Sequence, residues 1–181
     1  MNKNQKTLLA VALIFILPVT LAYLALNLGL YTPGVGNKGE LLEPPLEITT
    51  AEQEQLPDTW RIGTRIPADC TQGCEHAIYV LSQTWYALGR ENDRVNAVGI
   101  TGREEPTPAP RVPDDSVLEF YQLPETHELL EELPPYSLFI MDPLGNIILY
   151  YEGSSDRDTM IMQARDLLDD LETLLKMSRV G

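Results

Sequence analysis

The chain has 181 residues and is acidic, with 27 Asp and Glu against 13 Lys and Arg and a formal net charge of −14 at pH 7. A surface of this charge is repelled by phosphate backbones and anionic headgroups, which argues against nucleic-acid binding. The length leaves room for one ordinary domain of about 120 residues besides the terminal segments.

The first predicted element is a transmembrane anchor over residues 7–31, a segment without a charged side chain. As a helix it would extend about 37 Å, enough to cross a hydrocarbon core of about 30 Å. Lys3 and Lys6 precede it and Lys38 is the first basic residue after it, so the positive-inside bias predicts a cytoplasmic tail at residues 1–6. A cleaved signal peptide is the alternative, but its apolar core spans only about 7–15 residues.

Residues 32–58 are predicted to be an extended linker, since they are rich in Gly, Pro and Glu and show no sustained period. Within them, residues 40–48 (ELLEPPLEI) could dock on the fold. Residues 59–181 are predicted to form the ordered domain.

The domain begins with a strand, a helix and a second strand. Apolar and polar residues alternate over 59–66, which predicts a strand. Apolar residues recur at helical spacing over 75–91, where a glycine marks the end, and strand character returns over 94–101. Residues 102–115 contain four prolines and are predicted to be a surface loop.

The second half of the domain is predicted to contain a helix over 115–123 and a short turn or helix over 125–133. Two apolar segments rich in β-formers, 136–142 and 146–153, are joined by DPLGN, which is typical of a hairpin. An amphipathic helix of about 20 residues follows, with an apolar face that runs from Met160 to Leu175.

The predicted order is therefore β, α, β, α, β, β, α. A crossover helix makes the first two strands parallel and the terminal hairpin adds antiparallel neighbours. The predicted fold class is α/β, a thioredoxin-like mixed sheet flanked by helices and preceded by one N-terminal transmembrane helix.

Both cysteines, Cys70 and Cys74, lie where the first strand passes into the first helix. A spacing of four residues places both sulfurs on one side of a helix turn, with Cα atoms about 6 Å apart, within the range of a disulfide. The helix N-terminus favours a thiolate, as would Arg61 or Arg65, whereas the neighbouring Asp69 and Glu75 oppose it.

Three interpretations of the cysteine pair remain open at this point. A permanent clasp would close so short a loop that it constrains the unfolded chain little. A redox pair needs nothing beyond the two sulfurs. A copper(I) site is the third, because this soft ion prefers thiolates, with His76 or His127 as candidate further ligands although both are ordinary surface histidines by default.

The anchor, the arm, the CxxxC turn and the hairpin LFIMDPLGNIILYY together resemble the SCO family of membrane-anchored, thioredoxin-fold copper and cytochrome oxidase assembly factors. The chain is also similar to SCO-like proteins of proteobacteria that carry an NKGELLEPP-type arm, and the resemblance covers residues 37–179. It implies a single-pass protein of the bacterial inner membrane with a periplasmic C-terminal domain. Its protein client would be a cytochrome oxidase subunit or a copper chaperone.

One departure from the family concerns its copper-binding histidine, which lies roughly eight residues ahead of the Asp of the D-P-x-G turn. That position holds Pro134 in this chain, and His127 lies seven residues too early. Pro135 instead stands where thioredoxin folds place a cis-proline beside the cysteines, so we expect a cis bond between Pro134 and Pro135, close to Cys70.

The resulting hypothesis is thiol-disulfide exchange, with Cys70 attacking, Cys74 resolving and Pro135 beside them. No cofactor is required and copper(I) is possible. Such a protein would act stoichiometrically or slowly, so its status as an enzyme stays open. The alternatives are a copper(I) metallochaperone that uses Cys70, Cys74 and a histidine, and a non-catalytic interaction module.

Overall fold

The structure, a computed structural model, describes residues 2–27 and 36–178. The chain divides into two compact units, residues 1–36 and 37–181. In the first unit, α1 (Lys3–Asn27) contains most of the predicted helix, and residues 28–31 of the predicted anchor lie outside the described residues. Among the described residues, no helix combines the length and the apolar character that crossing a membrane requires.

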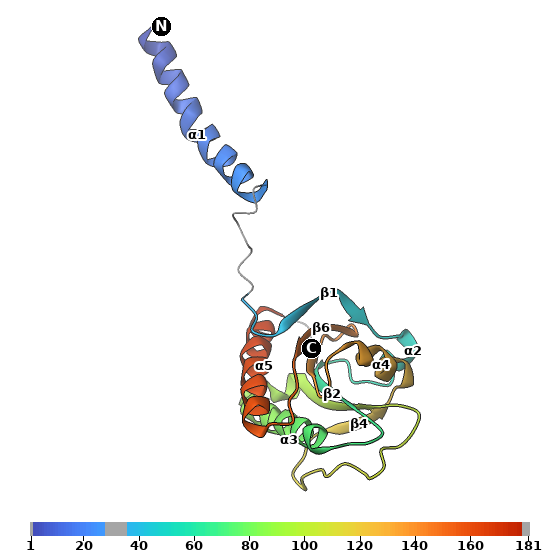
Figure 1. The fold of residues 1–181 in the computed structure, drawn as a ribbon. Helices are drawn as coiled ribbons and strands as arrows, with labels where there is room; N and C mark the ends of the chain where they lie inside the picture. Colours follow the sequence, from blue (N-terminus) through green and yellow to red (C-terminus); the bar gives the residue numbers. More distant parts are fainter. Residues whose placement is uncertain (1, 28–35, 179–181) are drawn as a thin grey trace. The chain divides into compact units, whose positions relative to one another are not determined.

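The second unit is built on a six-stranded mixed sheet (Figure 1). Pairing is parallel between β2 and β3 and between β3 and β4, and antiparallel between β2 and β5, β5 and β6, and β6 and β1. In sheet order the strands are β1 (Glu40–Glu47), β6 (Asn146–Tyr151), β5 (Leu138–Met141), β2 (Trp60–Ile66), β3 (Val95–Thr101) and β4 (Glu119–Gln122).

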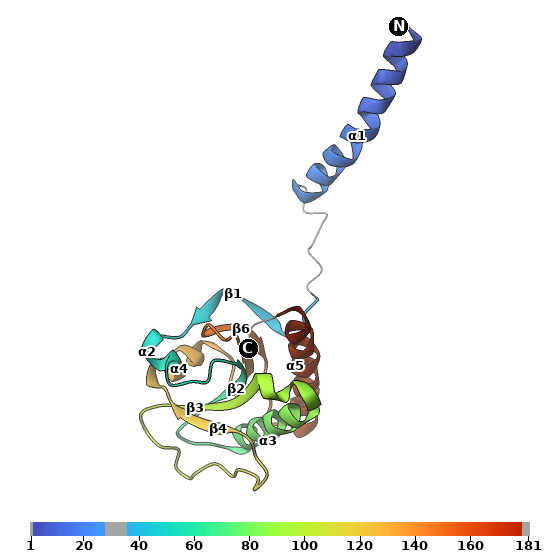
Figure 2. The same ribbon diagram turned by 180° about the vertical axis from the view of Figure 1, so that it is seen from behind.

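Helices cover both faces of this sheet, as the two opposite views show (Figures 1 and 2). The longer pair packs together on one face, over a core that includes Cys70 and Cys74, and the short helices lie at the other face, over a second core. The helices are α2 (Thr50–Gln53), α3 (Gln72–Ala87), α4 (Pro124–Leu129) and α5 (Arg157–Met177), with 3-10 turns η1 (Gly89–Arg94) and η2 (Leu130–Glu132). The predicted mixed sheet flanked by helices is thus confirmed.

The central strand β2 is buried almost throughout, because helices cover it from both sides. Its Ile62 and Ile66 face the core beneath α3, while Arg61 is fully buried. The Arg61 guanidinium donates to the carbonyls of Pro57 at 2.8 Å and Pro143 at 3.3 Å. Burial lowers the pKa of this guanidinium, so its hydrogen bonds offset a real desolvation cost.

The prediction of an irregular linker is wrong for residues 40–53, which form β1 and α2. β1 pairs with β6, and its register shifts between Leu41 and Leu46, around the two prolines of ELLEPPLEI. Leu42 and Leu46 pack against the second core. The prolines are tolerated because β1 is an edge strand. The register shift interrupts the alternation of side chains along β1, so the sequence does not show the period of two that is typical of a strand.

The prediction of a helix over residues 115–123 is also wrong, since Glu119–Gln122 is the edge strand β4. The register of β4 sets Phe120 opposite Gly99 of β3, and a Cβ on Gly99 would lie 3.0 Å from the Phe120 ring. Tertiary pairing with β3 therefore overrides a local pattern that looked helical.

The hairpin and the C-terminal helix are confirmed. In the turn of the hairpin, Asp142 Oδ1 accepts hydrogen bonds from the N–H groups of Leu144 at 2.9 Å and Asn146 at 2.8 Å. Gly145 has a φ of 91°, which glycine adopts readily. At the start of α5, Asp156 accepts from the N–H of Thr159 at 2.9 Å, a normal N-cap.

A buried carboxylate on α5 holds the start of the second unit. Asp170 is 6% exposed and accepts hydrogen bonds from the N–H groups of Lys38 and Gly39, at 2.8 and 2.9 Å to Oδ2. The hydroxyl of Tyr151 donates to the same oxygen at 2.8 Å. Residues 38 and 39, β6 and α5 are thus fixed to one another by a single side chain.

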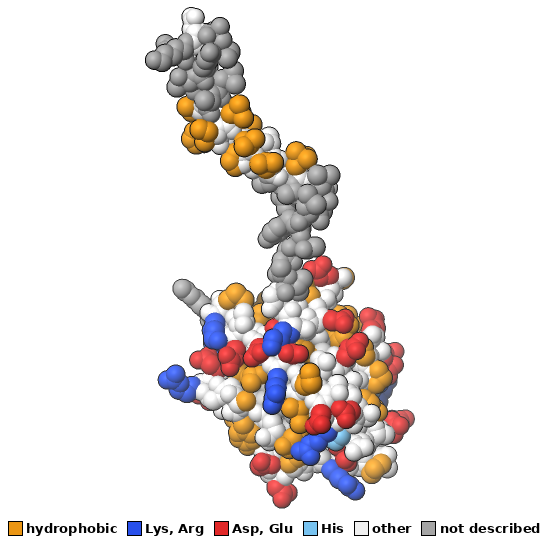
Figure 3. Space-filling model, turned by 60° about the vertical axis from the view of Figure 1, so that its left-hand side comes forward, with side chains coloured by type: hydrophobic (Ala, Val, Ile, Leu, Met, Phe, Trp, Pro, Cys, Tyr) orange, Lys and Arg blue, Asp and Glu red, His pale blue; other side chains and the backbone are white. Residues whose placement is uncertain are grey.

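Charged side chains are distributed over the surface, with acidic and basic residues interspersed on the face shown in Figure 3. Among the exposed ion pairs, Lys38 Nζ lies 3.1 Å from Asp166 and 2.5 Å from Asp169. Pairs of this kind stabilise a fold by at most about 1 kcal/mol each. The sheet and its two cores carry the stability.

Candidate functional site

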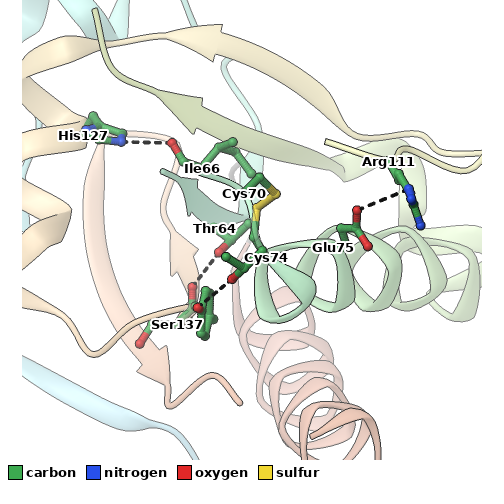
Figure 4. Close-up of a disulfide and its surroundings, with 10 residues drawn as sticks. Thr64, Ile66, Cys70, Cys74, Glu75, Arg111, His127 and Ser137 are labelled. Atoms are coloured by element: carbon green, nitrogen blue, oxygen red, sulfur yellow. Dashed lines mark hydrogen bonds and ion pairs between the residues drawn. A yellow bond between two sulfur atoms is a disulfide. The ribbon is translucent and has the colours of Figure 1, made fainter. Parts of the chain in front are cut away.

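The candidate site lies at the carboxyl end of β2, where the chain leaves the sheet and enters α3 (Figure 4). Cys70 lies two residues before the helix and Cys74 lies in its first turn, and the two are joined in a disulfide with a Cα–Cα distance of 5.4 Å. The expected proximity of the two sulfurs is thereby confirmed. The Cα–Cα distance lies within the usual range for a disulfide.

The two cysteines differ in exposure. Cys70 is 8% exposed and Cys74 is 1% exposed, and both belong to the core beneath α3. A reacting thiol must approach from outside, so the more exposed Cys70 is the easier target. The assignment of Cys70 as attacking and Cys74 as resolving residue stays a prediction.

A small pocket of about 180 Å³ lies beside the disulfide. The loop between β2 and α3 supplies one wall, with Asp69 and Thr71, and Pro135 and Tyr136 supply another. Pro135 thus lines the same pocket as the two residues that flank Cys70, and its expected role beside the cysteines stays a prediction.

The expected cis bond before Pro135 is wrong. In the described residues the cis peptide bonds precede Pro44 and Pro108. The Pro134 carbonyl accepts from the N–H of Ser137 at 3.3 Å, which closes a turn with Pro135 and Tyr136 at its centre. Tyr136 has a φ of 61°, and this combination of a central proline and a following positive φ is that of a type II turn, which uses a trans bond.

Tyr136 is a residue of the site that the sequence reasoning missed. Its hydroxyl is hydrogen-bonded to the hydroxyl of Thr71 at 2.8 Å, directly at the start of α3. Its ring lies against Gly73, where an added Cβ would come within 2.6 Å of the ring. A glycine in the first turn of the helix and a Pro-Pro-Tyr turn are the signals that could have drawn attention to this contact.

The charges around the disulfide come from several elements. Asp69 precedes Cys70, and Arg65 at the end of β2 pairs with Glu131 at 2.8 Å. Glu75 on α3 lies 3.8 Å from Arg111 of the proline-rich loop (Figure 4). Arg61, which the sequence offered as a second cation, is held by the carbonyls of Pro57 and Pro143 instead.

Neither histidine completes a metal site. His127 Nε2 is hydrogen-bonded to the Ile66 carbonyl at 3.0 Å, and its ring lies apart from the sulfurs (Figure 4). Burial lowers the pKa of His127. The Nδ1 atom of His76 is buried without a hydrogen-bond partner. In the described parts of the chain, no group of three His, Cys, Asp or Glu side chains could hold a metal ion, so a three-ligand copper site does not fit this arrangement.

The sequence matches the family described as transmembrane-like, thioredoxin-like, C-terminal domain over residues 60–178. The chain belongs to this thioredoxin-like family. Its match spans the sheet from β2 onward together with the disulfide and α5. A search of curated proteins finds no match.

Several solved structures of low sequence identity are similar to this chain, and the likeness to the first of them supports a shared fold. Apo Sco1 from Thermus thermophilus matches with a TM-score of 0.50 at 14% identity and covers 79% of this chain and 99% of its own. A SCO1/SenC family lipoprotein from Bacillus anthracis str. Ames gives 0.45 at 14%, covering 67% and 84%. A putative thiol:disulfide interchange protein DsbE from Chlorobium tepidum gives 0.46 at 14%, covering 75% and 96%.

In this thioredoxin-like domain, the proline-rich loop after β3 borders the cysteine segment. The N–H of Thr107 donates to the Ala68 carbonyl at 2.8 Å, two residues before Cys70. Between this loop and the ends of β3 and β4 lies a groove of about 420 Å³, with Phe120 and Val112 among its lining residues. β2, β3 and β4 run parallel, so the groove and the disulfide lie at the same edge of the sheet.

Proposed function

We propose that the protein carries out thiol-disulfide exchange through Cys70 and Cys74. The observation that carries this proposal is the disulfide itself, formed at the loop-to-helix turn of a thioredoxin-like domain, with a pocket lined by the two residues that flank the more exposed Cys70. A bridge over so short a loop stabilises the fold only modestly, so a purely structural role explains it poorly.

The exchange proceeds in two balanced steps. In the reducing direction, the Cys70 thiolate attacks one sulfur of a client disulfide and releases one client thiolate, which leaves a mixed disulfide. The Cys74 thiolate then attacks the Cys70 sulfur and releases the second client thiolate. The client gains two electrons and the Cys70–Cys74 pair becomes a disulfide. The oxidising direction is the reverse.

The proposed client is a subunit of cytochrome oxidase or a copper chaperone whose cysteines must be in a defined redox state. Support comes from the resemblance of the arm, the CxxxC turn and the hairpin to the SCO family, and the shared fold agrees with it. Copper would then belong to the client, with no copper cofactor required in this chain.

The reduction potential of the pair tests the proposal. We expect equilibration with glutathione buffers to give a potential between about −300 and −150 mV, the range of bridges that cycle. A value below about −300 mV would mark a static clasp and contradict the proposal. Tight one-to-one binding of copper(I) by the reduced chain, lost in Cys70→Ser, would favour a copper carrier instead.

We also propose that residues 7–31 anchor the protein in a bacterial inner membrane, with the thioredoxin-like domain in the periplasm. Support comes from the uncharged segment and from Lys3 and Lys6 before it. The full chain should remain in the membrane pellet after alkaline carbonate washing, whereas a chain that begins at Asn37 should be released. Release of both would contradict the anchor.

A further inference from the structure

The hydroxyl of Thr71 does not cap the helix that begins next to it. Thr71 is the N-cap residue of α3, yet its side chain makes no capping hydrogen bond. A threonine at this position normally accepts from the N–H of the second or third helical residue, and the third helical residue here is Cys74. The Thr71 hydroxyl is instead hydrogen-bonded to the Tyr136 hydroxyl at 2.8 Å.

The position of Tyr136 is fixed by close packing on two sides. Its ring covers Gly73, and a Cβ on Gly153 would lie 2.0 Å from the Tyr136 carbonyl oxygen. Its φ of 61° completes the turn that begins at Pro134. The packing of the ring and the conformation of the turn therefore hold the Tyr136 hydroxyl next to Thr71.

The first turn of α3 keeps a free donor as a result. Among the residues that the structure describes, none accepts a hydrogen bond from the N–H of Cys74. The disulfide bonds the Cys70 sulfur to the sulfur of Cys74, whose own N–H group belongs to the first turn of the helix. N–H groups at a helix N-terminus stabilise a thiolate once the bridge is reduced.

We propose that Tyr136 is a positioning residue: by holding the Thr71 hydroxyl away from the helix, it keeps the first-turn N–H groups available to the reduced Cys70 sulfur. The proposal rests on the proposed exchange function, because a thiolate matters only if the pair cycles. Other titratable or charged groups near the pair are Asp69, Glu75, His76, Arg65 and Arg111, and none of them changes in the variants below.

The test is the pH profile of Cys70 alkylation in the fully reduced, full-length chain, followed by peptide mass spectrometry. In Tyr136→Phe the ring stays and the freed Thr71 hydroxyl caps Cys74, so alkylation at pH 6 should slow about fivefold and the profile should move to higher pH. Thr71→Val alone should alkylate like the wild type. The double variant Tyr136→Phe, Thr71→Val should return to the wild-type profile, which a merely structural role of Tyr136 would not produce.

An unchanged profile in Tyr136→Phe, or a shifted profile in the double variant, would overturn the proposal. Gly73→Ala provides a second route, because its new methyl group displaces the ring and should reproduce the Tyr136→Phe shift. Alkylation is measured after chemical reduction, so it is independent of the reduction potential. A reduction potential too low for cycling would therefore refute the exchange function, but it would not change what the alkylation profile shows about Tyr136.

Discussion

Replacing Cys70 with serine should abolish thiol-disulfide exchange completely. The hydroxyl of serine is not ionised at neutral pH and cannot form the mixed disulfide through which exchange proceeds. The Cys70–Cys74 bridge is also lost, at a cost of about 2 kcal/mol for a loop this short, so the chain should remain folded. Exchange is measured with a fluorescent glutathione disulfide under conditions where the wild type turns over.

Cys74→Ser is the matched variant. It removes Cys74, the residue expected to resolve the mixed disulfide, which is 1% exposed, and keeps Cys70, which is 8% exposed. A client disulfide should then be trapped on Cys70 as a stable mixed disulfide, visible as a mass increase that dithiothreitol removes. Trapping through Cys74 in Cys70→Ser, with none through Cys70, would reverse the assigned roles. Equal exchange by the wild type and both variants would exclude the pair from the reaction.

A larger loss of stability than that from opening the disulfide is expected for Asp170→Ala. This change leaves the N–H groups of Lys38 and Gly39 and the Tyr151 hydroxyl without their common acceptor in a buried place. Groups left in that state cost about 1–3 kcal/mol each and are only partly additive, so the free energy of unfolding should fall by about 3–4 kcal/mol. Urea denaturation followed by far-ultraviolet circular dichroism measures the change.

The control for this prediction is the adjacent Asp169→Ala. Asp169 has a side chain that is 59% exposed and forms an ion pair with Lys38 Nζ. Its removal should change the free energy of unfolding by less than about 1 kcal/mol. If the two variants lost equal stability, general charge on α5 would explain the result better than the hydrogen bonds of Asp170.

The elements predicted correctly are those in which the spacing of apolar residues along the sequence matches the face that the fold buries. The strands β2 and β3, the hairpin and α5 follow from local alternation or helical spacing, and the cysteine pair follows from its place between β2 and α3. Contacts distant in sequence caused the errors. β4 exists because Phe120 packs on Gly99, and β1 exists because Leu42 and Leu46 reach the second core.

The proximity of the two cysteines in the candidate site could be predicted from the sequence, but the residues around them could not. Cys70 and Cys74 are four residues apart, so local geometry was sufficient to bring them together. Tyr136 contacts Thr71, which lies 65 residues away in the sequence. The contact depends on a turn with a positive φ at Tyr136, which the local sequence does not predict. The analogy that assigned a cis bond to Pro135 failed because the chain makes a type II turn there.

The two margins of the sheet have different capacities to recruit another polypeptide. β1 carries Pro44 and Pro45 and a register shift, so it lacks the continuous row of amide donors on which a foreign strand could grow. β4 is four residues long, and among the described residues no strand pairs with its outer side. A continuous β-sheet built from many copies can form only if both edges of the sheet can pair with another strand. Here at most one edge, that of β4, can do so. Edge-to-edge association of copies would therefore stop at a dimer.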